Sequence, residues 1–263
     1  MKLQVLVTSM YQTDDSLYDK MNINSDCLIA NQTDCYRLDI TKRGDNRIKL
    51  VSTSTRGVGK NRNIALMEAD GDILLFADDD IRYNDDYAEK VIDAFENNKQ
   101  ADAIIFGMDL TKDGKVFCEI RNRDCRARLF NSLRYGTYVL AVRRQSVLKH
   151  NVFFHQMFGG GCQYSCGEDS IYIRDCFKAK MKIYKSSYVL GNCSKDESTW
   201  FKGYNDKYFY DKGALFKALF PNSFMLFRLM YAIRIGRNTG VKLNHVIRLF
   251  FKGYNEFLKI ESN

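Results

Sequence analysis

The chain has 263 residues, of which 45% are hydrophobic and 13% aromatic, enough to bury a full core. No uncharged apolar run approaches the roughly 18 residues of a membrane span. The start of the chain lacks the pattern of a secretory signal, so we expect synthesis and retention in the cytosol. The eight cysteines show no paired zinc-site spacing, and we expect reduced thiols rather than a disulfide framework.

The formal net charge of +8 is concentrated at one end of the chain. Residues 201–263 hold eleven Lys or Arg against four Asp or Glu, whereas residues 1–200 are nearly balanced. This asymmetry indicates an anionic partner for the C-terminal segment, either a membrane surface or a nucleic acid.

Hydrophobic patterning predicts strands that alternate with helices of about ten residues over the first 110 residues, which is typical of βαβ units and a mainly parallel sheet. After residue 107 the pattern favours further strands with less helix between them, so we expect a mixed sheet. The predicted strands are residues 3–8, 25–31, 47–52, 73–77, 103–107, 115–120 and 136–142. The predicted helices are residues 14–21, 60–69, 87–97 and 168–180, and residues 31–34 are expected to form a polar loop.

Three carboxylates directly follow the apolar run at residues 73–77. In an extended chain, side chains at i and i+2 leave on the same side, so Asp78 and Asp80 are expected to converge and Asp79 to face away. Such a pair at the carboxyl end of a strand suits Mg²⁺ or Mn²⁺ and leaves room for phosphate oxygens. The alternative is a solvated acidic turn that caps the next helix.

Two glycines and three cations occur together in the segment Arg56-Gly57-Val58-Gly59-Lys60-Asn61-Arg62-Asn63. Glycines at the start of a helix permit close backbone approach, and the helix N-terminus favours an anion, so contacts to a nucleotide or its diphosphate are expected. The spacing is neither the dinucleotide-binding nor the Walker pattern. A flexible turn with solvated basic residues is the alternative.

A second glycine-rich stretch, Gly159-Gly160-Gly161, precedes a helix that begins Gly167-Glu168-Asp169. Three consecutive glycines suit a loop against which a ligand lies. Acidic residues in a first helical turn can simply stabilise the helix dipole. The functional interpretation is that one of the two carboxylates is a general base, kept ionised by the helix N-terminus.

Taken together, the ordered motifs resemble family 2 glycosyltransferases of the GT-A fold, of the type that builds bacterial capsule, O-antigen and other polysaccharides. The resemblance covers residues 3 to about 200. It implies a Rossmann-like α/β domain with a mixed, mainly parallel sheet and helices on both faces.

The resemblance also assigns residues to roles. Asp78 and Asp80 would hold the metal as a DxD pair, and Asp169, next to Glu168, would be the base of an inverting transfer. The charge on the leaving diphosphate would be neutralised by the metal together with Lys60 or Arg62. The nucleotide-sugar would be bound by Thr8, Asn31, Asp34, Lys60, Arg62, Asp78 and Asp79, and the acceptor by Gly159, Gly160 and Gly161.

One position departs from the family pattern. Many GT-A enzymes supply a further metal ligand from a histidine near the point where Ser198-Thr199-Trp200 stands, and none of the three histidines of this chain lies close before it. Asp196 or a water would take that role, or the metal would be held by the carboxylate pair and the diphosphate alone.

The C-terminal segment carries apolar residues at helical spacing in two stretches. Leu226, Leu229, Met230 and Ile233 form one stripe, and Leu243, Val246, Ile247 and Phe250 form another. Both helices would either pack on the catalytic domain or attach residues 222–263 to an anionic membrane, a peripheral location that suits a lipid-linked acceptor.

We therefore expect a catalytic domain at residues 1–205, with a nucleotide-sugar half (1–110) and an acceptor half (111–205), followed by a basic helical segment at 206–263. The predicted activity is metal-dependent transfer of a hexosyl group from a nucleotide-sugar, expected to be a UDP-sugar, to a saccharide or lipid-linked glycan. The alternatives are a nucleotidyl- or phosphotransferase that uses the same carboxylates, and a basic nucleic-acid-binding protein.

Overall fold

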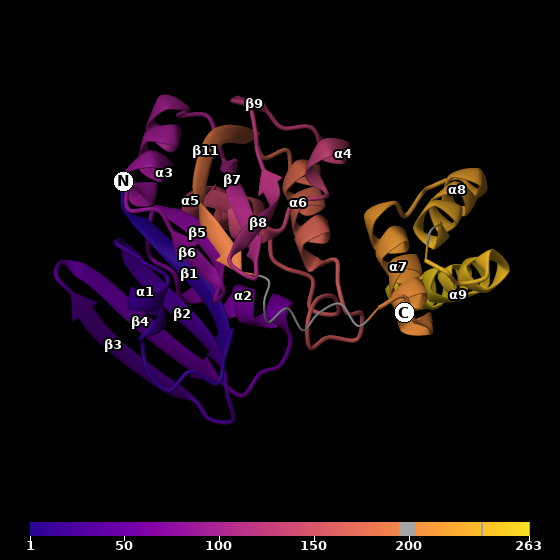
Figure 1. The fold of residues 1–263 in the computed structure, drawn as a ribbon, viewed down its shortest axis with the longest axis horizontal. Coiled ribbons are helices and arrows are strands. Elements are labelled where there is room, and N and C mark those ends of the chain that lie inside the picture. Colours follow the sequence, from indigo (N-terminus) through magenta and orange to yellow (C-terminus); the bar gives the residue numbers. More distant parts are fainter. Residues whose placement is uncertain (195–202, 238, 263) are drawn as a thin grey trace.

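The computed structural model describes residues 1–194, 203–237 and 239–262. The described strands form one mixed sheet in the order β3-β4-β2-β1-β5-β10-β7-β11-β6, with β8 added to β7 and β9 to β11 (Figure 1). The expected α/β fold with a mixed sheet is confirmed. The strands are β1 (Leu3–Met10), β2 (Asp26–Gln32), β3 (Arg37–Arg43), β4 (Asn46–Thr53), β5 (Ile73–Asp78), β6 (Ile81–Tyr83), β7 (Ala103–Lys112), β8 (Lys115–Ile120), β9 (Cys125–Arg126), β10 (Leu140–Arg143) and β11 (Ile183–Ser194).

Parallel pairing joins β4, β2, β1 and β5 in one block and β7 to β11 in another, and the remaining pairs are antiparallel. In the first block the carboxyl ends of β1, β2, β4 and β5 meet at one edge, which is where open α/β sheets bind ligands. The helices of the α/β body are α1 (Leu17–Lys20), α2 (Val58–Glu68), α3 (Tyr87–Asn97), α4 (Leu129–Ser132), α5 (Arg144–His150) and α6 (Glu168–Lys178), with a 3₁₀ turn η1 (Thr137–Val139).

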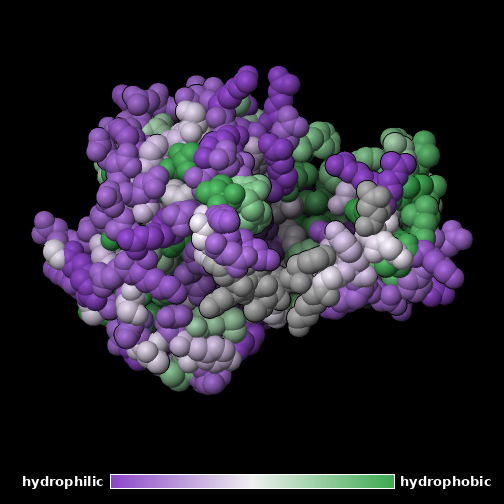
Figure 2. All heavy atoms as spheres, in the orientation of Figure 1, coloured by the Kyte–Doolittle hydropathy of each residue, from purple (hydrophilic) through white to green (hydrophobic). Residues whose placement is uncertain are grey.

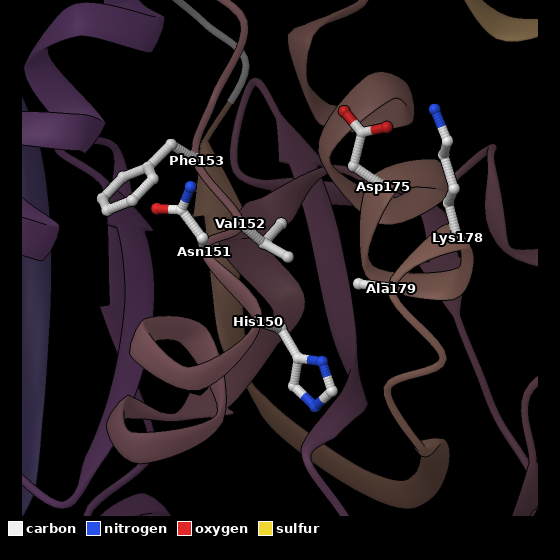
Figure 3. A pocket seen from close by; sticks show the side chains of 7 residues that line it. All are labelled: His150, Asn151, Val152, Phe153, Asp175, Lys178 and Ala179. Carbon is white, nitrogen blue, oxygen red and sulfur yellow. The ribbon is translucent and has the colours of Figure 1, made fainter.

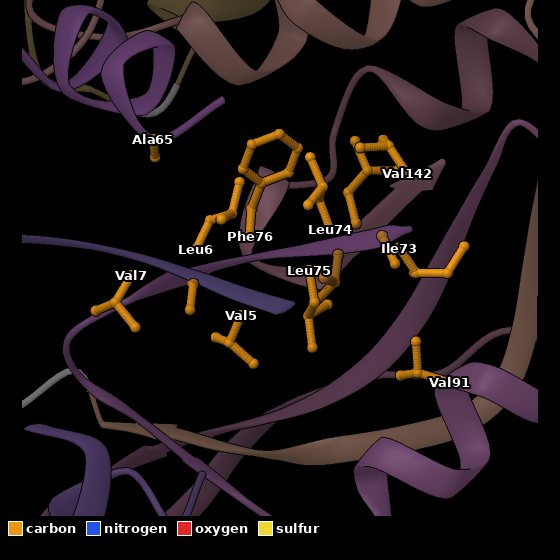
Figure 4. Packing of buried hydrophobic residues seen from close by; sticks show 14 of the residues in the cluster. Val5, Leu6, Val7, Ala65, Ile73, Leu74, Leu75, Phe76, Val91 and Val142 are labelled. Atoms are coloured by element: carbon orange, nitrogen blue, oxygen red, sulfur yellow. The ribbon is translucent and has the colours of Figure 1, made fainter. Parts of the chain in front are cut away.

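Strand β5 lies at the centre of this core, and residues 73–77 are almost entirely buried. Its side chains alternate between the two faces of the sheet (Figure 4). Leu74 and Phe76 point to the side of Ala65 on α2, whereas Ile73 lies towards Val91 on α3. Helices therefore cover both faces of the sheet, and the apolar run predicted as a buried strand is confirmed.

Several predicted elements differ from the structure. The helix predicted at 14–21 is only the single turn α1, because Asp14 accepts a hydrogen bond from the Ser16 amide and Asn22 takes a positive φ of 56°. The strand predicted at 136–142 begins only at Leu140, since η1 precedes it. Strands β3 and β11 and helix α5 were not predicted. β3 is an edge strand exposed on both faces, so it lacks a buried pattern.

The C-terminal segment folds as three helices, α7 (Asp206–Leu219), α8 (Met225–Gly236) and α9 (Leu243–Ser262). Helix α7 was not predicted. It packs closely against α9, and Gly213 of α7 and Gly253 of α9 allow this approach. A Cβ on Gly213, for example, would lie 1.9 Å from the Phe250 carbonyl oxygen. Phe216, Ala232, Phe250 and Tyr254 form the small core of this helical unit. Phe257 of α9 packs on Phe158 and Tyr164, which attaches the unit to the α/β body. Within the described ranges, no helix is long and apolar enough to cross a membrane.

Candidate active site

The carboxyl ends of β1 and β5 bring the first predicted site residues together. Thr8 is paired in register with Asp78, and its hydroxyl lies 3.3 Å from the Ala77 carbonyl oxygen and 3.4 Å from Asp78 Oδ1. Asp78 is the last residue of β5, so its carboxylate stands at the open edge while the preceding residues are buried. The prediction that Thr8 and Asp78 lie at one site agrees with this geometry.

The carboxylates after Asp78 are positioned by a turn rather than by strand alternation. β5 ends at Asp78, and Asp79 and Asp80 connect it to β6. The Asp80 carbonyl accepts the Ser194 amide at 3.0 Å, and the buried Cys193 thiol donates to Asp80 Oδ1 at 3.2 Å. Asp80 therefore lies in a turn that contacts β11, and the convergence of Asp78 and Asp80 on one cation stays a prediction.

Burial, and then the charges of Asp78 and Asp80, raise the pKa of Asp79 to about 6. Three crowded carboxylates of this kind are a hard-oxygen donor set that fits a divalent cation. Among the described residues, however, no three His, Cys, Asp or Glu side chains are grouped so as to hold a metal by themselves. Mg²⁺ often takes one or two carboxylates and completes its shell with substrate phosphates and waters, so the residues present fit such an ion. Asp196, a candidate further ligand, lies outside the described residues.

Arg62 of α2 is the centre of the site. Its side chain is only 4% exposed, and its guanidinium donates to carboxylates on two different elements. Nη2 lies 2.9 Å from Asp78 Oδ1, whereas Nη1 lies 2.7 Å from Asp169 Oδ1 and 3.1 Å from Glu168 Oε1. The guanidinium also lies over the Phe154 ring, at 5.3 Å from its centroid. A planar fork of donors suits such multiple pairing, which the point charge of a lysine would not reproduce.

This arrangement keeps Arg62 charged. Burial alone would lower its pKa, but the charges of Asp169, Asp78 and Glu168 outweigh burial and raise the pKa above its ordinary value. Arg62 is thus a fixed cation whose hydrogen bonds in the described structure are with protein carboxylates. In this structure the Arg62 guanidinium links the carboxyl end of β5 to the start of α6, and a contact between Arg62 and a nucleotide diphosphate stays a prediction.

The two acidic residues at the start of α6 have different environments. Asp169 is 26% exposed and accepts hydrogen bonds through Oδ1 from Arg62 and, at 2.6 Å, from the Thr137 hydroxyl. Glu168 is buried, and burial followed by the charge of Asp169 raises its pKa from 4.5 to about 7. Asp169 is therefore the carboxylate that a substrate can reach, whereas the buried Glu168, with its raised pKa, is the less suitable of the two for the expected general base.

The glycine-rich loop packs onto the start of α2. The Val58 amide donates to the Gly160 carbonyl at 2.9 Å, and the Gly57 amide donates to Gln32 Oε1 at 2.7 Å. Gly159 has a φ of 102°, and a Cβ there would lie 2.4 Å from Val58 Cγ1 and 2.7 Å from Glu168 Cδ. The amides of Gly57 and Val58 thus already have protein acceptors, and binding of a phosphate at the α2 N-terminus stays a prediction. Gly161 is exposed and Gly159 is buried, so only part of this loop can border an acceptor.

The other residues predicted to bind the nucleotide differ in how deeply they are buried. Asn31 is fully buried, and its amide bonds the backbone of Gln12 and the Ser52 hydroxyl, so it positions the chain after β1 rather than facing a ligand. Asp34 is exposed and pairs with Arg56. Lys60 is an exposed residue of α2.

Two features of the site were missed by sequence reasoning. The exposed ring of Tyr11 directly follows β1 at the ligand-binding edge, with the Arg56 guanidinium 5.7 Å from its centroid. Its position right after the first strand is a signal that could have identified it. Thr137 could not have been found in this way, because its contact with Asp169 depends on the irregular turn η1.

A surface hollow at the far end of α6 is a separate feature (Figure 3). His150, Asp175 and Lys178 are among the side chains that line it, and burial raises the pKa of Asp175. Asp175 lies near the C-terminal end of α6, whereas Asp169 lies in its first turn. The hollow is therefore distinct from the carboxylate site.

Comparison with known proteins agrees with the fold. Residues 33–153 match the family model described as Glycosyl transferase family 2, a range that includes Arg62 and Asp78. The chain is a glycosyltransferase, and its resemblance to family 2 is confirmed. No curated protein matches the chain.

Similar solved structures include several of TarS from S. aureus. The structure of TarS residues 1–349 in complex with UDP-GlcNAc has a TM-score of 0.58 at 16% identity, and the match covers 98% of this chain and 72% of that one. The same TarS fragment gives a TM-score of 0.56 at 15% identity, covering 100% and 74% of the two chains. Its complex with UDP gives 0.54 at 17% identity, covering 98% and 71%. At these identities the likeness concerns the fold, which is GT-A-like.

Proposed function

We propose that this chain transfers a sugar from a nucleotide-sugar donor, a UDP-sugar, to a saccharide or lipid-linked glycan acceptor in cell-surface polysaccharide synthesis. One observation carries the proposal. Arg62 joins Asp78, at the end of β5, to Asp169, which is 107 residues from Arg62 in the sequence. A donor-side carboxylate and an acceptor-side carboxylate thus lie on either side of one buried cation.

The donor would lie along the carboxyl edge of β1, β2 and β5. Thr8 and Asp78 offer polar contacts there, and the exposed ring of Tyr11 offers a face for a nucleobase. Asp34 and Lys60 are exposed residues on nearby elements. UDP is the favoured nucleotide because similar TarS structures were solved in complex with UDP-GlcNAc and with UDP.

Asp169 is proposed as the general base. Its Oδ1 is fixed by Arg62 and Thr137, and within the described residues its Oδ2 makes no hydrogen bond or ion pair. Oδ2 is thus placed to take the proton of an acceptor hydroxyl as that oxygen attacks the anomeric carbon. Attack on the face opposite the leaving diphosphate would invert the configuration of that carbon. Arg62 would keep the Asp169 carboxylate oriented throughout.

Asp78 and Asp80 are the residues that would hold Mg²⁺ or Mn²⁺. When bound, such an ion would neutralise the charge that grows on the departing diphosphate. Arg62 occupies Oδ1 of Asp78, so Oδ2 is the oxygen left for a cation. Lys60 is an exposed basic residue near the start of α2. We propose that its side chain adds positive charge near the leaving group.

Donor turnover tests the proposal. The protein is incubated with Mn²⁺ and a panel of UDP-, GDP- and dTDP-sugars, and released nucleoside diphosphate is measured by ion-exchange chromatography. Release from one donor, lost with EDTA and with Asp80→Ala, is expected. Release of a nucleoside monophosphate would instead favour a nucleotidyl- or phosphotransferase.

A slow enzyme without its acceptor could still bind its donor, so binding is measured in parallel. Calorimetry with UDP and Mn²⁺ should give a heat of binding that disappears in Asp80→Ala. No nucleotide binding together with no turnover would overturn the proposal.

A further inference from the structure

Helix α8 presents apolar side chains to solvent. The α8 face is defined here as Phe224, Met225, Leu226, Phe227 and Met230, all of which are exposed, and Phe224 is 85% exposed. Figure 2 shows this hydrophobic surface over α8 at the outer end of the helical unit. Contiguous apolar surface of this kind marks an interaction site rather than scattered exposure.

Phe227 of the α8 face packs inward, with its ring centroid 5.4 Å from that of Phe216, whereas Phe224, Met225, Leu226 and Met230 are not part of the small core of the helical unit. On α8 and in its loop, the side chains that pack inward are Ala232, Phe220, Tyr231 and Ile235, against Phe216 and Phe250. In the stripe predicted on α9, Val246 and Phe250 are fully buried, whereas Leu243 is 40% exposed. The more exposed apolar residues of the two predicted stripes, Leu226 and Met230, therefore lie on α8.

A series of ring contacts continues this surface onto the α/β body. Phe227 lies 5.7 Å from Phe220 between ring centroids, and Phe220 stacks on Phe130 of α4 at 6.1 Å. Phe130 itself is 73% exposed. The apolar surface thus runs from α8 to α4, across the two parts of the molecule.

The charge along residues 222–255 has a single sign. Residues 222–255 contain six Lys or Arg and no Asp or Glu. Leu226, Met230, Arg234 and Arg237 follow one another at intervals of three or four residues, which places them on one face of α8. Met230 and both arginines are exposed, so this face is apolar at its start and basic at its end.

We propose that the α8 face and Phe130 seat the protein on an anionic membrane, and that the acceptor reaching Asp169 is carried by that membrane. Apolar side chains would enter the boundary between headgroups and acyl chains while Arg234 and Arg237 meet anionic headgroups. The second half of the proposal rests on the proposed transferase function, whereas membrane binding does not.

The position of α4 links this surface to the site. The residue after α4, Leu133, accepts a hydrogen bond through its carbonyl from the Ser170 hydroxyl at 2.7 Å. Ser170 is the neighbour of Asp169, and Thr137, only a few residues further along, donates to the Asp169 carboxylate. A membrane in contact with Phe130 therefore lies on the same side as the proposed base. An acceptor saccharide with a lipid tail could remain in the membrane while its hydroxyl reaches Asp169.

Vesicle co-flotation tests the surface directly. The full chain is mixed with vesicles of phosphatidylcholine alone or of phosphatidylcholine with phosphatidylglycerol. We expect binding only to the anionic vesicles, reduced about tenfold or more in the triple variant Phe224→Ser, Met225→Ser and Leu226→Ser. Arg234→Gln with Arg237→Gln should lower binding and weaken its dependence on salt. The matched control is Leu38→Ser with Ile40→Ser, since both are exposed apolar residues of the distant edge strand β3.

Equal flotation of the wild type and the triple variant, or no flotation of the wild type, would overturn the proposal. A concentration-dependent dimer in light scattering that the triple variant abolishes, without vesicle binding, would assign the face to a second copy of the chain. Donor turnover in solution should be unchanged in the triple variant. Vesicle binding without any donor turnover or nucleotide binding would preserve the surface and reject the transferase, so the two failures are distinguishable.

Discussion

The α/β body and the C-terminal helical unit use charge and apolar surface in opposite ways. In the body, a buried arginine is surrounded by three carboxylates, and apolar side chains fill both faces of the sheet. In the helical unit, the arginines of α8 lie near no Asp or Glu in the sequence, and large apolar side chains are exposed. In the body, charged side chains are thus paired with one another to fix a polar site. In the helical unit, apolar side chains remain exposed and available to a partner.

The largest expected effect is on chemistry in the body. Asp169→Asn removes the proposed base while keeping a group that can still accept from Arg62 and Thr137. We expect the rate of sugar transfer to fall by about 10²–10⁴-fold, the usual contribution of a positioned base. The measurement is kcat with the identified donor and acceptor. Asp175→Asn, on the same helix but beside the separate hollow, should leave kcat within about twofold. Equal losses in both variants would contradict a specific role for Asp169.

The second prediction compares an arginine from each region. Arg62→Ala leaves three carboxylates without their shared partner, and we expect the free energy of unfolding in urea to fall by about 3–5 kcal/mol. Arg228→Ala in α8 removes a guanidinium that lies 4.5 Å from the Tyr254 ring centroid and donates to Ser223, and should cost only about 1 kcal/mol.

A conservative variant separates charge from geometry at the same position. Arg62→Lys keeps one positive charge but cannot reach Asp78 and Asp169 together with the same fork of donors. It should recover part of the stability and little of the transfer rate. Full recovery of both would show that only a buried positive charge is needed there.

The strand and the helix that carry the candidate site could be predicted because each depends on residues that are close in the sequence. The apolar run of β5 ends in the carboxylates, and α6 begins at Glu168, as the pattern predicts. Both features depend on short-range rules, namely the burial of a central strand and the acidic first turn of a helix. The same rules found α3 at its observed bounds.

What the sequence could not give is the set of contacts between distant segments. Arg62 was predicted to contact a phosphate because it follows two glycines, and its hydrogen bonds to α6 and β5 become visible only when these elements pack together. The same applies to Gly160, whose carbonyl closes the start of α2. Strand β3 was missed because both of its faces are exposed. The register between strands, the packing of loops and the pairing of charges depend on tertiary structure. The periodicity of hydrophobic residues in the sequence carries little information about them.

The third prediction uses the raised pKa of Glu168. In the folded protein the pKa is about 7, whereas the ordinary value is 4.5. Between these two values the folded state holds more protons than the unfolded state, so the free energy of unfolding should fall as pH rises. In Glu168→Gln the side chain cannot titrate. The decrease in the free energy of unfolding between pH 5 and pH 7.5 should therefore be smaller by about 2 kcal/mol than in the wild type. Urea unfolding at several pH values gives both slopes. An unchanged slope would show that Glu168 is ionised throughout this range.

The smallest expected effect comes from replacing one glycine in each of the two regions. Gly159→Ala would place a Cβ against Val58 and Glu168 at a φ of 102°, whereas Gly240 in the helical unit has a φ of 74° and nothing within 4 Å of a built Cβ. Both substitutions strain the backbone, but only the first also collides with side chains at the site. We expect Gly159→Ala to lower the free energy of unfolding by about 1–2 kcal/mol more than Gly240→Ala. Because Glu168 must move to accept the Cβ, transfer should slow in Gly159→Ala alone. Equal effects on stability and rate would mean that the glycine-rich loop is no more tightly packed on the site than a surface turn.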